Sequence, residues 1–158
     1  MELSMSLGYM KKQRGTQTPR SLEAAARLCA EAGFAYADYT PDYISPDWER
    51  KAHEDRAILD ALGIQVEQSH APYNRYGTYD RELFPEYFAR SFEAARIVGA
   101  KYVAVHADEY RTTDHYDPKE IEDFAWEYLA PHAEFAAKNN MIMAIENVFE
   151  DVVEGCPQ

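Results

Sequence analysis

The sequence predicts an α/β fold with a parallel β-sheet. Five short apolar segments alternate with four amphipathic segments of helical period, and this alternation is typical of parallel strands joined by right-handed helical crossovers. The apolar segments also read as buried on both faces, as a parallel sheet requires. The chain has 158 residues and is 46% hydrophobic, enough for one core but too short for two ordinary domains. We therefore expect a single domain over residues 1–158.

The predicted strands are short and apolar. In chain order they are Leu3–Leu7, Phe34–Tyr39, Ile64–His70, Tyr102–His106 and Met141–Glu146. Their last residues recur at intervals of 31 to 40 residues, which is the length of one strand–helix unit.

Four predicted helices lie between these strands. They are Ser21–Ala32, Pro46–Leu62, Phe84–Val98 and about Pro118–Lys138. In each, apolar residues recur at spacings of three and four, which places them on one face of a helix. Gly33, Gly63 and Gly99 directly follow the first three patterns, where glycine commonly ends a helix.

Two architectures fit this alternation. An open, doubly wound sheet of five strands would be complete at this length. A (β/α)8 barrel needs about 250 residues, so the chain would supply about the first four strand–helix units and the fifth strand. No glycine-rich phosphate loop follows any predicted strand, which removes the commonest reason for an open sheet. The period alone leaves both architectures open.

Composition narrows the class of partner. Asp and Glu number 28 against 16 Lys and Arg, for a formal charge of −12. Such a charge repels nucleic acid and favours small-molecule or protein partners. No apolar run approaches the roughly 20 residues that span a bilayer, and no secretory signal is recognisable. We therefore expect a cytoplasmic protein that is not bound to a membrane.

Three consecutive predicted strands end in a possible metal ligand, namely His70, His106 and Glu146. Catalytic residues of parallel α/β folds lie at the carboxyl ends of strands, and neighbouring strands are about 4.8 Å apart. We expect His106 to lie within reach of both other side chains, in a set that suits a divalent cation. By alternation, the residues expected to face the helices are Val103, Val105, Met143 and Ile145.

Simpler interpretations compete with this one. A histidine at a strand end is usually a partly exposed residue with one hydrogen bond. A carboxylate that closes an apolar strand, as Glu146 does, is costly to bury without a cation or hydrogen bonds. The loop after the third predicted strand carries Tyr73, Tyr76 and Tyr79, which could stack on a sugar ring or could equally form a lid or an oligomer contact.

The chain resembles the xylose isomerase-like TIM-barrel superfamily, which includes sugar isomerases and epimerases, dehydratases and the endonuclease IV group. The resemblance is carried by Ser69–Tyr73, by Val105–His106 and by Ala144–Asn147. It implies a parallel (β/α)8 barrel. It also implies a metal-dependent isomerase or epimerase that acts on a small-molecule sugar or sugar phosphate through proton abstraction and an enediolate.

The resemblance assigns roles to individual residues. Glu146 matches the first metal-binding glutamate, which in the epimerases is also an acid/base. His70 and His106 match histidines that line the substrate pocket in the sugar enzymes and bind additional zinc ions in the endonuclease group. Together with Tyr73 of the following loop, they are the expected substrate-binding residues. The implied cofactor is a divalent ion (Mn, Mg, Co or Zn), whose other ligands, an Asp, a His and a second Glu, follow strands six to eight and lie beyond this chain.

Other functions remain open from the sequence. One is an endonuclease IV-like phosphodiesterase, against which the −12 charge argues. Another is an inactive half-barrel that acts as an assembly or interaction module, including as a homo-oligomer, because half a barrel exposes two strand edges. We expect the length itself to reflect a truncated chain or gene fragment.

Overall fold

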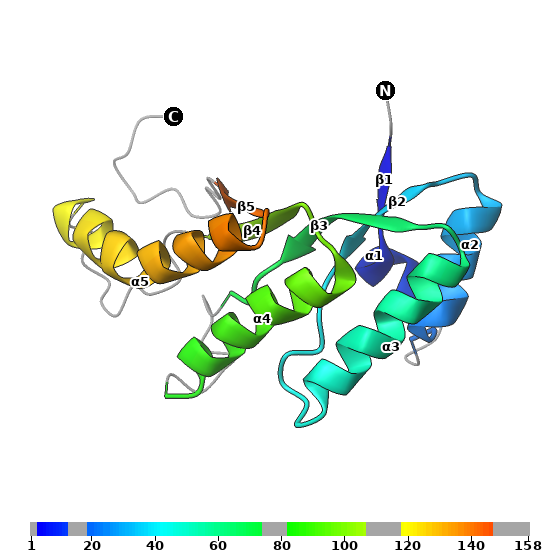
Figure 1. Cartoon of the computed structure of the whole chain (residues 1–158), viewed down its shortest axis with the longest axis horizontal. Coiled ribbons are helices and arrows are strands. Elements are labelled where there is room, and N and C mark those ends of the chain that lie inside the picture. Colours follow the sequence, from blue (N-terminus) through cyan, green and yellow to red (C-terminus); the bar gives the residue numbers. More distant parts are fainter. Residues whose placement is uncertain (1–2, 13–18, 74–81, 107–117, 147–158) are drawn as a thin grey trace.

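The computed structural model describes residues 3–12, 19–73, 82–106 and 118–146. Its elements, in chain order, are β1 (Ser4–Ser6), α1 (Leu7–Lys11), α2 (Leu22–Glu31), β2 (Tyr36–Tyr39), α3 (Trp48–Ala61), β3 (Gln65–His70), α4 (Phe84–Val98), β4 (Tyr102–His106), α5 (Pro118–Lys138) and β5 (Ile142–Glu146) (Figure 1). The five strands and four helices predicted from the sequence are all present. None of the helices in the described ranges has the length and apolar character needed to cross a membrane.

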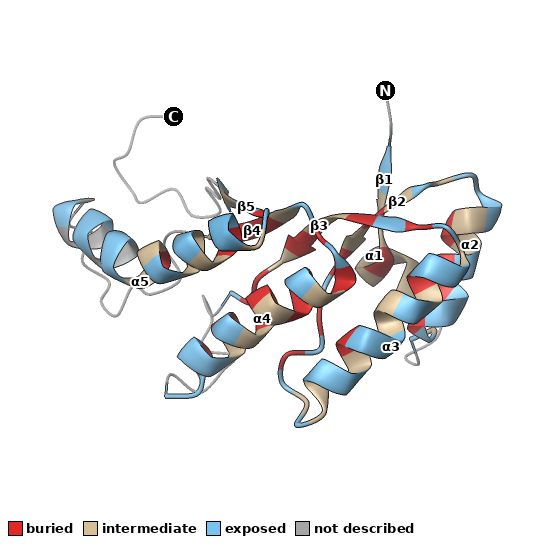
Figure 2. Cartoon of the chain, viewed as in Figure 1, coloured by how far each residue is buried: buried red, intermediate tan, exposed pale blue. Residues whose placement is uncertain are grey.

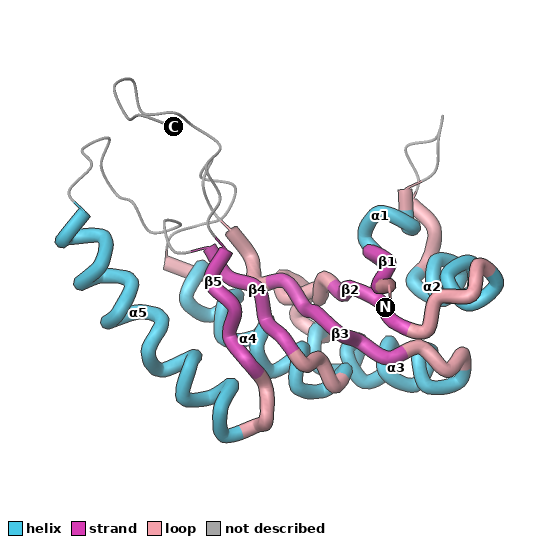
Figure 3. Tube along the Cα trace, turned by 90° about the horizontal axis from the view of Figure 1, so that it is seen from above, coloured by secondary structure: helices cyan, strands magenta, loops and turns pink. Residues whose placement is uncertain are grey.

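The order of the strands in the sheet distinguishes the two candidate architectures. The five strands are all parallel and lie in the order β1-β2-β3-β4-β5, so each pairs with the next in sequence. A doubly wound sheet reverses its strand order at a switch point, whereas a barrel adds strands in sequence. Helices α2 to α5 accordingly lie on one side of the sheet (Figures 1 and 3). The fold is therefore part of a TIM barrel, and the open-sheet alternative is excluded.

The first strand is shorter than predicted. Leu7 was expected to close it, but β1 ends at Ser6 and Leu7 begins the short helix α1. Leu7 is only 1% exposed, so the burial inferred from its apolar side chain is correct. A buried apolar residue at the end of a short apolar segment is compatible with either a strand or a helix. The sequence pattern therefore did not predict α1.

The core lies between the sheet and the helices, where Figure 2 shows the buried residues. Val103 and Val105 are buried there, as predicted, and so are the expected residues of α2, which are Leu22, Ala25, Ala26 and Cys29. Met143 is partly buried against the core, but Ile145 is 53% exposed. Ile145 is the register partner of Val105 and therefore lies on the helix-facing side of the sheet, as predicted. It is exposed because β5 is the last strand of the described sheet, and no further described helix covers it.

Two features of the structure favour glycine at position 99, directly after α4. The sequence predicts only the first, which is the end of the helix. The φ of 77° at Gly99 is a left-handed conformation that favours glycine. In addition, a Cβ atom at this position would collide with Nη1 of Arg56. Arg56 uses that nitrogen to donate a hydrogen bond of 2.7 Å to the carbonyl of Val98, which joins α3 to the end of α4. A side chain at position 99 would displace this contact.

Candidate functional site

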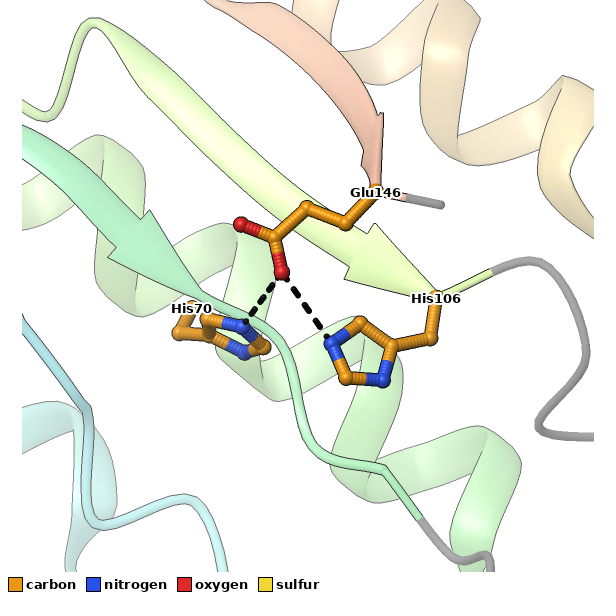
Figure 4. Close-up of side chains that lie close together, drawn as sticks. All are labelled: His70, His106 and Glu146. Atoms are coloured by element: carbon orange, nitrogen blue, oxygen red, sulfur yellow. Dashed lines mark hydrogen bonds and ion pairs between the residues drawn. The ribbon is translucent and has the colours of Figure 1, made fainter. Parts of the chain in front are cut away.

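The residues predicted to be metal ligands are the last residues of three adjacent strands. His70 closes β3, His106 closes β4 and Glu146 closes β5. His106 and Glu146 are register partners, and His70 pairs with Ala104, two residues before His106. Side chains alternate along a strand, so this register turns all three side chains to the face of the sheet opposite the helices (Figure 4).

The three side chains meet at one oxygen atom. Oε2 of Glu146 lies 3.3 Å from Nε2 of His70 and 3.2 Å from Nε2 of His106. The two imidazole rings stand nearly perpendicular, with centroids 5.1 Å apart. The side chains of His70, His106 and Glu146 are 28%, 11% and 41% exposed, so a small ligand can reach the cluster without unfolding the protein.

A backbone contact orients His70. Its Nδ1 lies 2.8 Å from the carbonyl oxygen of Ala71. A carbonyl only accepts hydrogen bonds, so Nδ1 carries the proton, and the neutral ring then presents the lone pair of Nε2 to the Glu146 carboxylate. Two acceptors facing each other repel unless a cation, either a proton or a metal ion, lies between them. The contact is also the one that metal-ligating histidines usually make with their second nitrogen.

The donor set fits a divalent metal ion. One ligand atom from each of His70, His106 and Glu146 lies within 4.8 Å of the others, and no other group of this kind occurs in the part of the chain that the structure describes. Ligands about 2.1 Å from a tetrahedral zinc ion lie roughly 3.4 Å apart, close to the two measured separations. Two imidazoles and a carboxylate are ligands that suit zinc, manganese and cobalt.

Tyr73 lies beside both histidines. Its ring stacks on His106 at a centroid distance of 5.2 Å and meets His70 edge-on at 6.4 Å. Half of Tyr73 is exposed, so its ring covers the cluster on one side and faces solvent on the other. The other predicted tyrosines, Tyr76 and Tyr79, and Asn147 of the Ala144–Asn147 motif lie outside the described residues.

Polar residues that no sequence motif marks line the same pocket as His70. A pocket of about 300 Å³ brings Asp38 and Gln68 together with His70 and Tyr73. Asp38 also accepts a hydrogen bond of 2.5 Å from Oγ of Ser4, across β1 and β2. Strand alternation places Asp38 on this face of the sheet. However, no motif marks Asp38 as functional, and a break in register between Ala37 and Asp38 shifts its pairing with β3.

Tyr39 anchors the loop that borders this pocket. Its hydroxyl donates a hydrogen bond of 2.7 Å to Oδ2 of Asp55 on α3. Burial, and then the charge of Asp55, raises the pKa of Tyr39, so its phenol stays protonated. Burial also raises the pKa of the Asp55 carboxyl, and the hydrogen bond from Tyr39 works against that shift. The pair fixes the carboxyl end of β2 relative to α3.

Comparison with known proteins gives a family and a fold. The family model described as "Xylose isomerase-like TIM barrel" matches residues 26–155. A search of curated proteins finds no match.

Three solved structures illustrate the likeness. A D-psicose 3-epimerase solved with D-fructose is 16% identical, with a TM-score of 0.69 over 97% of this chain and 55% of its own. An AP endonuclease of family 2 from Brucella melitensis is 15% identical, with a TM-score of 0.68 over 94% and 56%. A protein with a bound zinc atom is 14% identical, with a TM-score of 0.60 over 92% and 51%. At these identities the likeness shows the fold alone, and the chain spans about half the length of each of these proteins.

Proposed function

The chain belongs to the xylose isomerase-like TIM-barrel family, and we propose that it supplies the first half of the active site of a metal-dependent isomerase or epimerase. The proposed substrate is a small sugar or sugar phosphate, and the proposed reaction is proton transfer at a carbon next to a carbonyl group. The likeness to a D-psicose 3-epimerase whose structure was solved in the presence of D-fructose supports a substrate of this class.

The observation that carries the proposal is the convergence of His70, His106 and Glu146 at the carboxyl ends of three strands. One carboxylate oxygen, Oε2 of Glu146, lies within 3.3 Å of an imidazole nitrogen of each histidine. This edge of a barrel is where catalytic residues lie, and a partly exposed cluster of cation ligands has no evident role in stabilising the sheet.

The same three residues would hold the metal ion. A divalent cation bound there would polarise the carbonyl and hydroxyl oxygens of the substrate and make the adjacent C–H more acidic. His70 is prepared for this role, because its hydrogen bond to Ala71 directs the lone pair of Nε2 toward Glu146. The complete coordination set requires ligands in addition to these three.

Glu146 can combine two tasks because its oxygens point in different directions. Oε2 faces both imidazoles, while Oε1 points away from them (Figure 4). Oε1 is therefore available to accept the proton of the substrate carbon as a general base. The stacked ring of Tyr73 offers a flat apolar surface and a hydroxyl at the exposed side of His106, where a sugar could pack.

Exchange of a substrate proton with solvent tests the proposal. The protein is loaded with zinc or manganese and incubated with D-fructose or D-fructose 6-phosphate in D2O, and deuterium incorporation next to the carbonyl is followed by NMR. We expect incorporation that is lost in Glu146→Gln and kept in Glu134→Gln, a matched change on the exposed face of α5. Incorporation that persists in Glu146→Gln would contradict the proposal.

A second candidate is metal-dependent phosphodiester hydrolysis. It is supported by the likeness to an AP endonuclease of family 2 and by the pair of histidines at the cluster. The net charge of −12 opposes binding to DNA. Binding of this protein to an abasic DNA duplex that weakens steeply with salt, without exchange on sugars, would favour this alternative.

A further inference from the structure

Two lysines differ from the other basic residues of this acidic protein. Neither Lys11 nor Lys12 forms an ion pair or a hydrogen bond through its ammonium group within the described residues. Every other lysine and arginine side chain in those ranges contacts a carboxylate or a backbone carbonyl. These contacts are made by Arg20, Arg27, Arg50, Lys51, Arg56, Arg90, Arg96, Lys101, Lys119 and Lys138. Within the described residues, the ammonium groups of Lys11 and Lys12 are therefore left available to a ligand.

Both lysines line one pocket of about 860 Å³ at the carboxyl ends of β1 and β2. Its lining also includes Ser6, Tyr39, Thr40 and Asp42. The carboxylate of Asp42 is already paired with Lys51 at 2.7 Å, which offsets its charge. Asp55 lies close enough for the charge of Lys11 to lower its pKa, so the Asp55 carboxylate, which also accepts a hydrogen bond from Tyr39, offsets part of the charge of Lys11. The lining therefore has a positive balance that is available to an anion.

The backbone that carries the two lysines is held in place. Arg20 donates from Nη1 to the carbonyl oxygens of Met10 and Lys12, at 3.0 and 2.9 Å, and its backbone N–H donates to the carbonyl of Lys11 at 2.8 Å. These contacts satisfy three carbonyls at the end of α1 and bring a third cationic side chain to the same segment. The lysines thus project from an anchored turn, which reduces the entropy lost when they bind.

The pocket also borders the candidate active site. The smaller pocket that contains His70 and Tyr73 shares Ser6, Tyr39 and Thr40 with the lysine pocket. Helix α1 follows β1 directly at the carboxyl end of that strand (Figure 3). His70 closes the parallel strand β3 at the same edge of the sheet. A ligand with its reacting carbons at the histidine cluster can therefore extend toward Lys11 and Lys12.

From these observations we infer that the pocket is the subsite for the phosphate group of the substrate, and that the substrate is a sugar phosphate rather than a free sugar. Two ammonium groups match the charge of a phosphate monoester, which is close to a dianion at neutral pH. The inference rests on the proposed function, because it takes the sugar moiety to lie at the His70–His106–Glu146 cluster.

Binding measurements test the subsite separately from catalysis. Isothermal titration calorimetry of the zinc-loaded protein compares D-fructose 6-phosphate with D-fructose and with inorganic phosphate. The first ligand carries both the sugar and the phosphate group, and each of the others carries only one of them. The test variant carries Lys11→Met and Lys12→Met. The control carries Lys119→Met and Lys138→Met, which removes the same charge from exposed lysines on α5. Thermal unfolding verifies that both variants fold.

We expect D-fructose 6-phosphate to bind roughly tenfold or more tightly than D-fructose and than inorganic phosphate. That advantage should disappear in the Lys11/Lys12 variant and persist in the control. Equal binding of the two sugars, with no effect of the Lys11/Lys12 variant, would overturn the subsite. It would leave the proposed function intact if Glu146→Gln still abolished exchange. Equal binding of inorganic phosphate and D-fructose 6-phosphate would also overturn it, because the pocket would then be a general anion site unrelated to the sugar.

Discussion

Nε2 of His70 and Oε2 of Glu146 lie 3.3 Å apart although 76 residues separate them in the sequence. Strand β4 lies between their strands, so the contact spans two strand spacings of the sheet. Only long side chains that lean toward each other from the ends of β3 and β5 can make it. His106 on the intervening strand completes the arrangement at 3.2 Å from the same oxygen.

Loss of a histidine from this cluster should weaken zinc binding. Removing one of three protein ligands leaves the ion with fewer donors, so we expect His70→Ala to lower zinc affinity by at least about tenfold. Competition with a chromophoric chelator measures this value. His53→Ala, an exposed histidine on α3, serves as the control and should bind zinc like the original protein. Equal affinities in all three proteins would mean that the ion, if bound, lies elsewhere.

Tyr73 should contribute to sugar binding and not to stability. Because half of it is exposed, Tyr73→Ala should change the free energy of unfolding by no more than about 0.5 kcal/mol. The same change should weaken sugar binding, whereas Tyr73→Phe should retain the part that comes from ring stacking on the substrate. Titration with a sugar phosphate and urea unfolding give the two quantities. A large loss of stability with unchanged binding would identify Tyr73 as a structural lid.

His132 predicts a pH dependence of stability in a different part of the fold. Its ring lies between α4 and α5, with centroids 4.8 Å from Phe88, 5.0 Å from Phe92 and 5.6 Å from Tyr128. Burial lowers the pKa of His132 below its usual value of 6.5. The unfolded chain then binds the proton more readily, so stability is full above pH 6.5 and falls as the pH drops below it.

The variant His132→Leu isolates this effect. Its free energy of unfolding should change less between about pH 7 and pH 5 than that of the original protein, because the titrating ring is gone. The exposed His53→Leu serves as the control and should keep the original slope. Parallel curves for His132→Leu and the original protein would contradict the assignment.

Phe88 tests the packing of the helices on the sheet. It is fully buried on α4 and contacts Phe84, Phe92 and Tyr128. Phe88→Ala should cost about 3–5 kcal/mol, because the neighbouring rings cannot close the cavity completely. Trp126→Ala removes a larger aromatic side chain that is 68% exposed, and it should cost far less. Urea unfolding of both variants measures the difference, and similar costs would contradict this account of the core.

The arrangement of the site could be predicted because it depends on rules that act along the chain. Side-chain alternation and the shared edge of parallel strands are sufficient to bring His106 beside Glu146, its register partner. The choice between barrel and open sheet did not follow from the period, since both alternate strands and helices. Strand order decides it, and that order depends on long-range pairing such as that of β1 with β2.

The missed features are those that depend on tertiary context. Asp38 lies near a break in strand register, which no local pattern reveals. In the sequence, Lys11 and Lys12 are an ordinary pair of adjacent lysines that does not indicate a binding site. They became candidates only because the other cations of the described residues have partners and because both lysines line one pocket. Ile145 follows the alternation of its strand but is exposed, since burial depends on what covers β5.

X-ray absorption at the zinc edge of the zinc-loaded protein tests the central claim most directly, because it reports the atoms bound to the ion. We predict one zinc ion per chain with two imidazole ligands at about 2.0–2.1 Å and an additional oxygen shell. One imidazole should be lost in His70→Ala, and the zinc content should fall in Glu146→Gln. A spectrum without imidazole ligands, or one unchanged by both substitutions, would contradict a metal centre formed by His70, His106 and Glu146.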